Sequence, residues 1–166
     1  VFRTTSLKFR CDVASSVRLG MEIQPKNMTE REKEFCRRVI ADYKSVRPVV
    51  QFGDIYRLTS PYDGKGYASM MYVTPEKDKA VFYWWKIANF YDQHFPRGIM
   101  VGLDPDKNYK IHELNRIDLA PLPYEGKCFS GRFLMENGLE IPSSNNVEHN
   151  MKTDWSSRVL QLVEVQ

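Results

Sequence analysis

The spacing of apolar residues along this chain changes once, near Pro48, and that change limits the fold more than any other feature. Before Pro48 the apolar residues recur at helical spacing, and after it they fall into short alternating runs separated by turn residues. We therefore predict two unlike parts. Residues 1–48 should form a helix, a strand and a helix, and residues 49–166 an antiparallel β-sandwich, so that the fold is mainly β.

The N-terminal part contains two signals for the start of a helix. Ser6 can cap one helix, and Thr29 with its glutamate three residues later forms a capping box for the next. Apolar alternation over residues 21–23 predicts a short strand between them. Pro48 should end the second helix, because proline lacks the N–H that a helix interior needs. A strand followed by an amphipathic helix is the unit of α/β barrels, and one such unit cannot bury its own faces.

The second helix shows which face needs a partner. Its apolar stripe consists of Phe35, Val39, Tyr43 and Val46. A stripe of this kind packs against the strands of a barrel when the barrel is complete. In this chain we expect the first 48 residues to fray, to fold back on the sandwich, or to pair with a second copy of the chain as a homo-oligomer.

The C-terminal part has the spacing of an antiparallel β-domain. Pro- and Gly-containing turns separate six candidate strands, at 54–58, 67–74, 80–87, 98–103, 108–114 and 157–165. Ser130 can cap one short helix that Gly138 would end. Regular strands with tight turns favour a sandwich or meander over a second parallel unit.

Composition excludes several classes of protein. A chain of 166 residues with 42% hydrophobic content can bury a core without disulfide or metal staples. Its net charge of +3 is spread along the sequence, so we expect no nucleic-acid partner. No apolar run reaches the length of a membrane span, so no membrane partner is expected either. Cys11, Cys36 and Cys128 are widely spaced, and we interpret them as free, mostly buried thiols.

No pattern in the sequence indicates a catalytic or cofactor site. Walker loops, dinucleotide fingerprints and nucleophile elbows are all missing, so no cofactor is expected. Asp104 and Asp106 are a carboxylate pair of the type that glycosidases need, but they flank a proline and fit a solvated turn better. The histidines have no metal-ligand spacing, and we interpret His94, His112 and His149 as ordinary residues with no metal site.

Aromatic side chains are the strongest binding candidates. Tyr83, Trp84 and Trp85 lie in one run, and flat rings with polar edges can stack on sugar faces. Alternate residues of a strand face opposite sides, so at least one side of this run must be core, and we favour core packing over a sugar platform. The N-terminal arginines could contact a substrate, but a solvated face suits Arg3, Arg10 and Arg18 better.

Three blocks of sequence resemble one known family, in the same order and over nearly the whole chain. Residues 3–58 begin RTTSLKFRCDVASSVRLGMEIQPKNMTEREKEF and end VRPVVQFGDIYRL. Residues 70–87 and 102–111 read MMYVTPEKDKAVFYWWKI and GLDPDKNYKI. Residues 129–142 and 154–162 read FSGRFLMENGLEIP and DWSSRVLQL. Together they are similar to the C-terminal portion of glycoside hydrolase family 36, which consists of retaining α-galactosidases.

The resemblance implies an enzyme that removes terminal α-linked galactose from oligosaccharides such as the raffinose class. One aspartate would form a covalent glycosyl-enzyme, and a second would act as acid and then base. In that family both carboxylates precede the region matched here, so the resemblance gives this chain no catalytic residue. It implies instead a structural module partnered with an upstream catalytic barrel, and the alternative is a carbohydrate-binding module that uses exposed aromatic rings.

Overall fold

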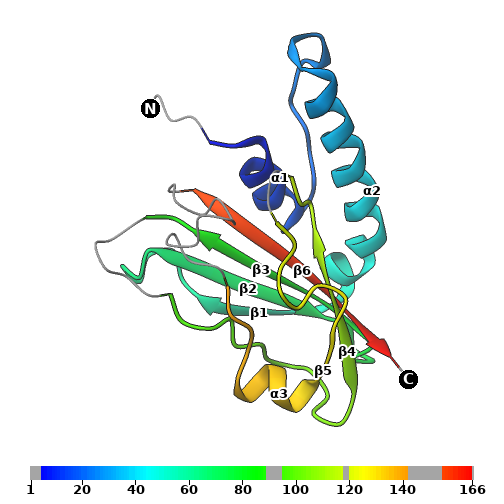
Figure 1. Cartoon of the computed structure of the whole chain (residues 1–166), viewed down its shortest axis with the longest axis vertical. Coiled ribbons are helices and arrows are strands. Elements are labelled where there is room, and N and C mark those ends of the chain that lie inside the picture. The colour runs from blue at the N-terminus through cyan, green and yellow to red at the C-terminus, as the bar shows by residue number, and fades with distance from the viewer. Residues whose placement is uncertain (1–4, 89–94, 118–119, 142–154, 166) are drawn as a thin grey trace.

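A computed structural model describes residues 5–88, 95–117, 120–141 and 155–165 (Figure 1). The elements in chain order are α1 (Leu7–Ser15), a 3-10 turn (Pro25–Asn27), α2 (Glu30–Phe52), β1 (Asp54–Thr59), β2 (Tyr67–Val73), β3 (Lys79–Lys86), β4 (Asn108–Leu114), β5 (Cys128–Ser130), α3 (Gly131–Glu136) and β6 (Ser156–Val165).

The strands form one six-stranded sheet in the order β1-β2-β3-β6-β4-β5, with every neighbouring pair antiparallel. The last strand in the chain, β6, therefore lies between β3 and β4. Helices α1 and α2 lie on one side of the sheet and α3 lies on the other (Figure 1). The prediction of a mainly β, antiparallel domain after the N-terminal helices is confirmed, and this architecture is consistent with a β-sandwich C-terminal domain.

The side of the sheet that faces α3 holds the larger core. Strand residues such as Phe82, Ile111 and Leu160 are fully buried there, and they pack against Met100 and Leu134. Besides α3, the layer above them consists mostly of connecting segments. In the described part of the chain the only pairing in that layer outside the named strands is the bridge between Gly98 and Leu139.

The predicted strand over residues 98–103 is therefore wrong beyond its first residue. The backbone N–H groups of this segment make hydrogen bonds outside the β-sheet. The Met100 N–H donates to the Leu134 carbonyl at 3.2 Å, and the Val101 N–H donates to the Met71 sulfur at 3.2 Å. Gly102 then takes a positive φ of 76°, which breaks the extended conformation. The short strand β5 was not predicted, since three residues give no measurable alternation.

The other side of the sheet is covered by the two N-terminal helices. Val46, Val49 and Val50 of α2 pack on Val81 and Val159 of the sheet. In the first half of α2, Phe35 and Val39 are fully buried against α1 and the segment that follows it. Of the three fates expected for the first part, the structure shows it folded against the sheet.

Two expectations about the N-terminal part are wrong. No strand is present at residues 21–23, because a strand needs a hydrogen-bonded neighbour and none lies beside this segment among the described residues. Pro48 does not end α2, which continues to Phe52. The carbonyl that loses its partner to Pro48 belongs to Lys44 on the exposed side of the helix, where water can reach it. Burial of the following valines outweighs the lost bond. The Ser6 cap and the Thr29 capping box are confirmed.

Gly53 makes the sharp passage from α2 into the sheet. Its N–H donates to the Val49 carbonyl at 2.9 Å, and β1 begins at the next residue. A Cβ built on Gly53 would lie 2.5 Å from the Val49 oxygen and 2.8 Å from the Val73 oxygen. Both are backbone atoms, so neither can move aside without displacing the helix end or β2.

We expect Gly53→Ala to destabilise the chain by about 1–3 kcal/mol, because the added methyl group overpacks two fixed backbone atoms. Urea unfolding measures this change. Gly20→Ala is the matched control, since a Cβ at Gly20 meets nothing within 4 Å and should change stability by less than about 0.5 kcal/mol. Equal effects of the two substitutions would contradict the close approach at Gly53.

Candidate functional site

The aromatic run divides between the two sides of the sheet. Trp84 is 1% exposed in the core that faces α3, and Tyr83 is 0% exposed on the helix side. Trp85 is partly exposed and stacks on Tyr83, with ring centroids 5.6 Å apart. Neither Tyr83 nor Trp84 presents a ring face to solvent, so Trp85 is the one residue of the three that a sugar could reach here.

The hydroxyl of Tyr83 has a different task, which two other tyrosines share. Helix α1 ends with carbonyls that have no partner within the helix. Tyr83 of β3 donates to the Ser15 carbonyl at 2.9 Å, and Tyr72 of β2 donates to the Ser16 carbonyl at 2.7 Å. Tyr43 of α2 donates to the carbonyl of the next residue, Val17, at 3.3 Å. Burial raises the pKa of Tyr72 and Tyr83, so both hydroxyls keep the proton that they donate.

A buried carboxylate attaches the middle of α1 to the sheet. Asp12 is fully buried and accepts hydrogen bonds from Lys8 at 2.7 Å, from Ser157 of β6 at 2.7 Å and from the Asn115 amide at 2.8 Å. The Asn115 backbone N–H in turn donates to Asp42 of α2 at 3.3 Å. Buried charges persist when they are paired and hydrogen-bonded in this way.

We call Asp12, Asn115, Ser157 and the three tyrosines the α1 anchor. Its members come from α1, α2, β2, β3, β6 and the end of β4. The sequence analysis missed it, although Lys8 and Asp12 at i, i+4 spacing, on the helix face that also carries Ser15, could have indicated a buried pair. The Asp12 carboxylate is occupied by hydrogen bonds from Lys8, Asn115 and Ser157. The α1 anchor therefore holds α1 on the sheet, and its groups are not arranged to act as an acid, a base or a nucleophile.

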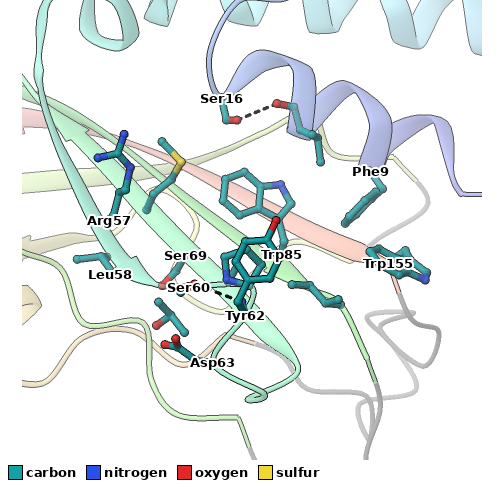
Figure 2. Close-up of a pocket in the computed structure, with 16 residues that line it drawn as sticks. Phe9, Ser16, Arg57, Leu58, Ser60, Tyr62, Asp63, Ser69, Trp85 and Trp155 are labelled. Carbon is teal, nitrogen blue, oxygen red and sulfur yellow. Dashed lines mark hydrogen bonds between the residues drawn. The ribbon is translucent and has the colours of Figure 1, made fainter.

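An open hollow of about 800 Å³ lies beside α1 on the same side of the sheet (Figure 2). Phe9, Val13 and Ser16 of α1 line one wall, and Trp85 and Trp155 line another. Ile87, strands β1 and β2 and the turn between these two strands supply the remaining lining, which includes Arg57, Asp63 and the 94% exposed Tyr62. Most of the side chains that face this hollow are apolar.

The remaining candidates do not gather into a site. Asp104 accepts from the Asp106 N–H at 3.0 Å, and Asp106 pairs with Arg132, so the turn interpretation is confirmed. His112 contacts Glu125 at the surface. Arg10 and Arg18 are exposed.

Several of the predicted residues cannot be placed. Arg3, His94 and His149 lie outside the described residues. Within the described part of the chain no group of histidine, cysteine and acidic side chains could hold a metal ion. No helix in that part is both long and apolar enough to cross a membrane.

The cysteines differ in accessibility. Cys11 and Cys36 are buried between α1 and α2, whereas Cys128 is exposed at the start of β5, and all three are free thiols. Burial raises the pKa of Cys11 to about 12, and it also raises the pKa of Cys36. The reactive form of a thiol is the thiolate, so neither buried cysteine is activated as a nucleophile.

Comparisons with known proteins agree on one family. Residues 67–162 match the model of the glycosyl hydrolase family 36 C-terminal domain, and residues 1–53 match the melibiase model. The α-galactosidase AgaA of Geobacillus stearothermophilus is 34% identical over 126 residues, which cover 76% of this chain and 17% of that protein.

Solved structures give the same result. The crystal structure of the α-galactosidase AgaB of the same organism matches 99% of this chain and 20% of its own, with a TM-score of 0.82 and 30% identity. A structure of an AgaA variant in complex with raffinose matches with a TM-score of 0.81 and 28% identity. The chain spans about a fifth of the length of the solved structures that it matches.

We expect Asp12→Ala to destabilise the chain by about 3 kcal/mol or more, because it leaves the Lys8 ammonium buried without its counter-charge. The midpoint of urea unfolding measures this loss. The double variant Lys8→Met with Asp12→Ala should recover part of it, since the uncompensated charge is gone. Arg37→Met, at an exposed ion pair with Glu34, is the control and should change little. An Asp12→Ala variant as stable as that control would contradict the α1 anchor.

At pH 8 we expect an aromatic disulfide reagent to modify one of the three cysteines rapidly, namely Cys128. The variant Cys128→Ser should then show almost no fast reaction. Cys11 should react faster only as the pH rises toward its pKa of about 12, because the thiolate forms there. Rapid labelling of Cys11 at pH 8 in the folded Cys128→Ser variant would show that the contact between α1 and α2 opens readily.

Proposed function

Because this chain belongs to glycosyl hydrolase family 36, we propose that it is the C-terminal portion of a larger α-galactosidase and supports the catalytic domain of that enzyme. The relatives that match nearly all of this chain are about five times longer, which supports the presence of a catalytic portion upstream. Residues 1–48 would be the end of the catalytic barrel, and residues 49–166 its C-terminal sandwich.

The α1 anchor is the observation that carries this proposal. Asp12 and the carbonyls of Ser15 and Ser16 lie in the part of the chain that matches the melibiase model, whereas Tyr72, Tyr83 and Ser157 lie in the part that matches the C-terminal domain model. Buried hydrogen bonds thus join the two matched regions. A barrel helix attached in this way cannot shift relative to the sheet without leaving buried polar groups unpaired.

The reaction that we propose for the larger enzyme is removal of terminal α-linked galactose from oligosaccharides of the raffinose class. Two carboxylates on opposite sides of the glycosidic bond perform such a hydrolysis without a cofactor. In this chain Asp12 is fully used by its own hydrogen bonds, and Asp104 and Asp106 lie in a turn. The catalytic pair would therefore lie upstream, and the role of this portion is to hold the barrel in shape.

Glycan binding is the second candidate function, and one observation favours it. Trp85 and Trp155 line the hollow beside α1, and indole rings stack well on sugars. We rank this function below the structural one because Tyr83 and Trp84 are buried and most of the lining of the hollow is apolar.

The isolated 166-residue chain should not hydrolyse an aryl α-galactoside, because it lacks a nucleophile and a proton donor on either side of the bond. The protein extended by the residues that its gene encodes before Val1 should hydrolyse it. Release of the phenol from the aryl galactoside measures the activity of both proteins under the same conditions. Steady turnover by the folded 166-residue chain, unchanged after repeated purification, would show that catalytic groups lie within it. An inactive extended protein would refute the assignment to an α-galactosidase.

A further inference from the structure

The hollow beside α1 is open on the side of the sheet that the N-terminal helices otherwise cover (Figure 2). Helix α2 covers the region around Val81 and Val159, and α1 covers the start of β6. Helix α2 also contacts β2 and β3, and the hollow lies over the part of the sheet that Leu58 of β1, Met70 of β2 and Trp85 of β3 line. The lining is mostly apolar, so packing of another element on it would be favourable.

The orientation of α1 indicates which element could cover the hollow. Cys11 packs against Phe35 and Val39, and so faces α2. Val13 is two residues further on, which is about 200° around the helix, and it faces the hollow together with Phe9 and Ser16. The hollow therefore lies on the side of α1 that is turned away from α2. Val13 remains 45% exposed and Val17 66% exposed.

Consecutive helices of a (β/α) barrel lie side by side in chain order around its outside. If α1 and α2 are the last two such helices, as the proposed function requires, the helix before α1 must lie on the opposite side of α1 from α2. That is where the hollow opens.

We propose that the hollow is the docking surface for an amphipathic helix from the catalytic portion that precedes Val1, which covers the sheet beyond α1. Apolar residues of that helix pack on Phe9, Val13, Met70 and Trp85. Arg57 and Asp63 lie at the border of the hollow, where they can pair with polar residues of the incoming helix. This inference rests on the proposed function, since it takes the upstream portion as the partner.

Cysteine accessibility tests the docking surface without disturbing the fold. In a Cys128→Ser background, Val13→Cys places a thiol in the hollow and Ile99→Cys places one away from it. The two positions are matched, because their side chains are 45% and 42% exposed. In the 166-residue chain both thiols should react with an aromatic disulfide reagent at similar rates. In the extended protein the Val13→Cys thiol should react at least ~10-fold more slowly, with no change at the Ile99→Cys thiol.

Three results would overturn the proposal. The first is an extended protein that hydrolyses an aryl α-galactoside although its Val13→Cys thiol reacts as fast as in the 166-residue chain. That result would contradict the docking surface and leave the proposed function intact. A second is protection of that thiol in the short chain by ~50 mM raffinose, which would make the hollow a sugar site of weak affinity. A third is protection in the short chain that grows with protein concentration, which would make a second copy the occupant. Protection in an extended but inactive protein would support the docking surface and refute the proposed function.

Discussion

The carbonyl groups at the end of α1 need hydrogen-bond donors, and the rest of the structure depends on how they are satisfied. A helix end buried on a sheet loses access to water, and each unpaired carbonyl costs about 1–3 kcal/mol. Tyrosine can bridge that distance from a strand because its hydroxyl lies at the far end of a rigid ring. Tyr72 and Tyr83 do so from neighbouring strands, and their rings meet edge to face. Hydrogen bonding and apolar packing therefore act at the same place and fix where α1 lies.

The two sides of the sheet are built differently, and the difference matches what each must hold. The side that faces α3 is mostly apolar but contains a buried ion pair between Arg158 of β6 and Glu113 of β4 at 2.6 Å. The side that faces α1 and α2 carries the polar contacts of Asp12 and the tyrosines. A purely apolar contact permits sliding, whereas directed hydrogen bonds to a buried carboxylate specify one arrangement. Such specification suits a contact between two units that must keep one orientation.

The fold could be predicted from the sequence wherever the signal was local. Caps at Ser6 and Thr29, the bounds of β4 and the turn at Asp104 follow from side-chain chemistry within a few residues, and they are confirmed. The errors have non-local causes. Pro48 is tolerated because the sheet buries the valines after it, and residues 21–23 are not a strand because pairing depends on a neighbour.

The site was harder to predict than the fold for the same reason. The rings of Tyr83 and Trp84 could be recognised from the sequence as either core or sugar platform, but the carbonyl that the Tyr83 hydroxyl reaches is 68 residues away. Asp12 likewise joins Ser157, 145 residues along the chain. No spacing rule connects positions so far apart, because their approach is set by the order of strands in the sheet. That order places β6 beside β3 and β4, and with it Ser157 under α1.

The central place of β6 also has a consequence for synthesis on the ribosome. The chain emerges from its N-terminal end, so β1, β2 and β3 leave the exit tunnel first and β4 and β5 follow them, while the strand that joins the two groups emerges last. Until then the nascent sheet is two separate halves, and the edges of β3 and β4 that later pair with β6 are open to other strands. Ser157 arrives with β6, so α1 obtains its last hydrogen bond to the sheet only when translation of this region is nearly complete. From the emergence of β4 until that of β6, the chain therefore presents two unpaired edges to chaperones and to other nascent chains.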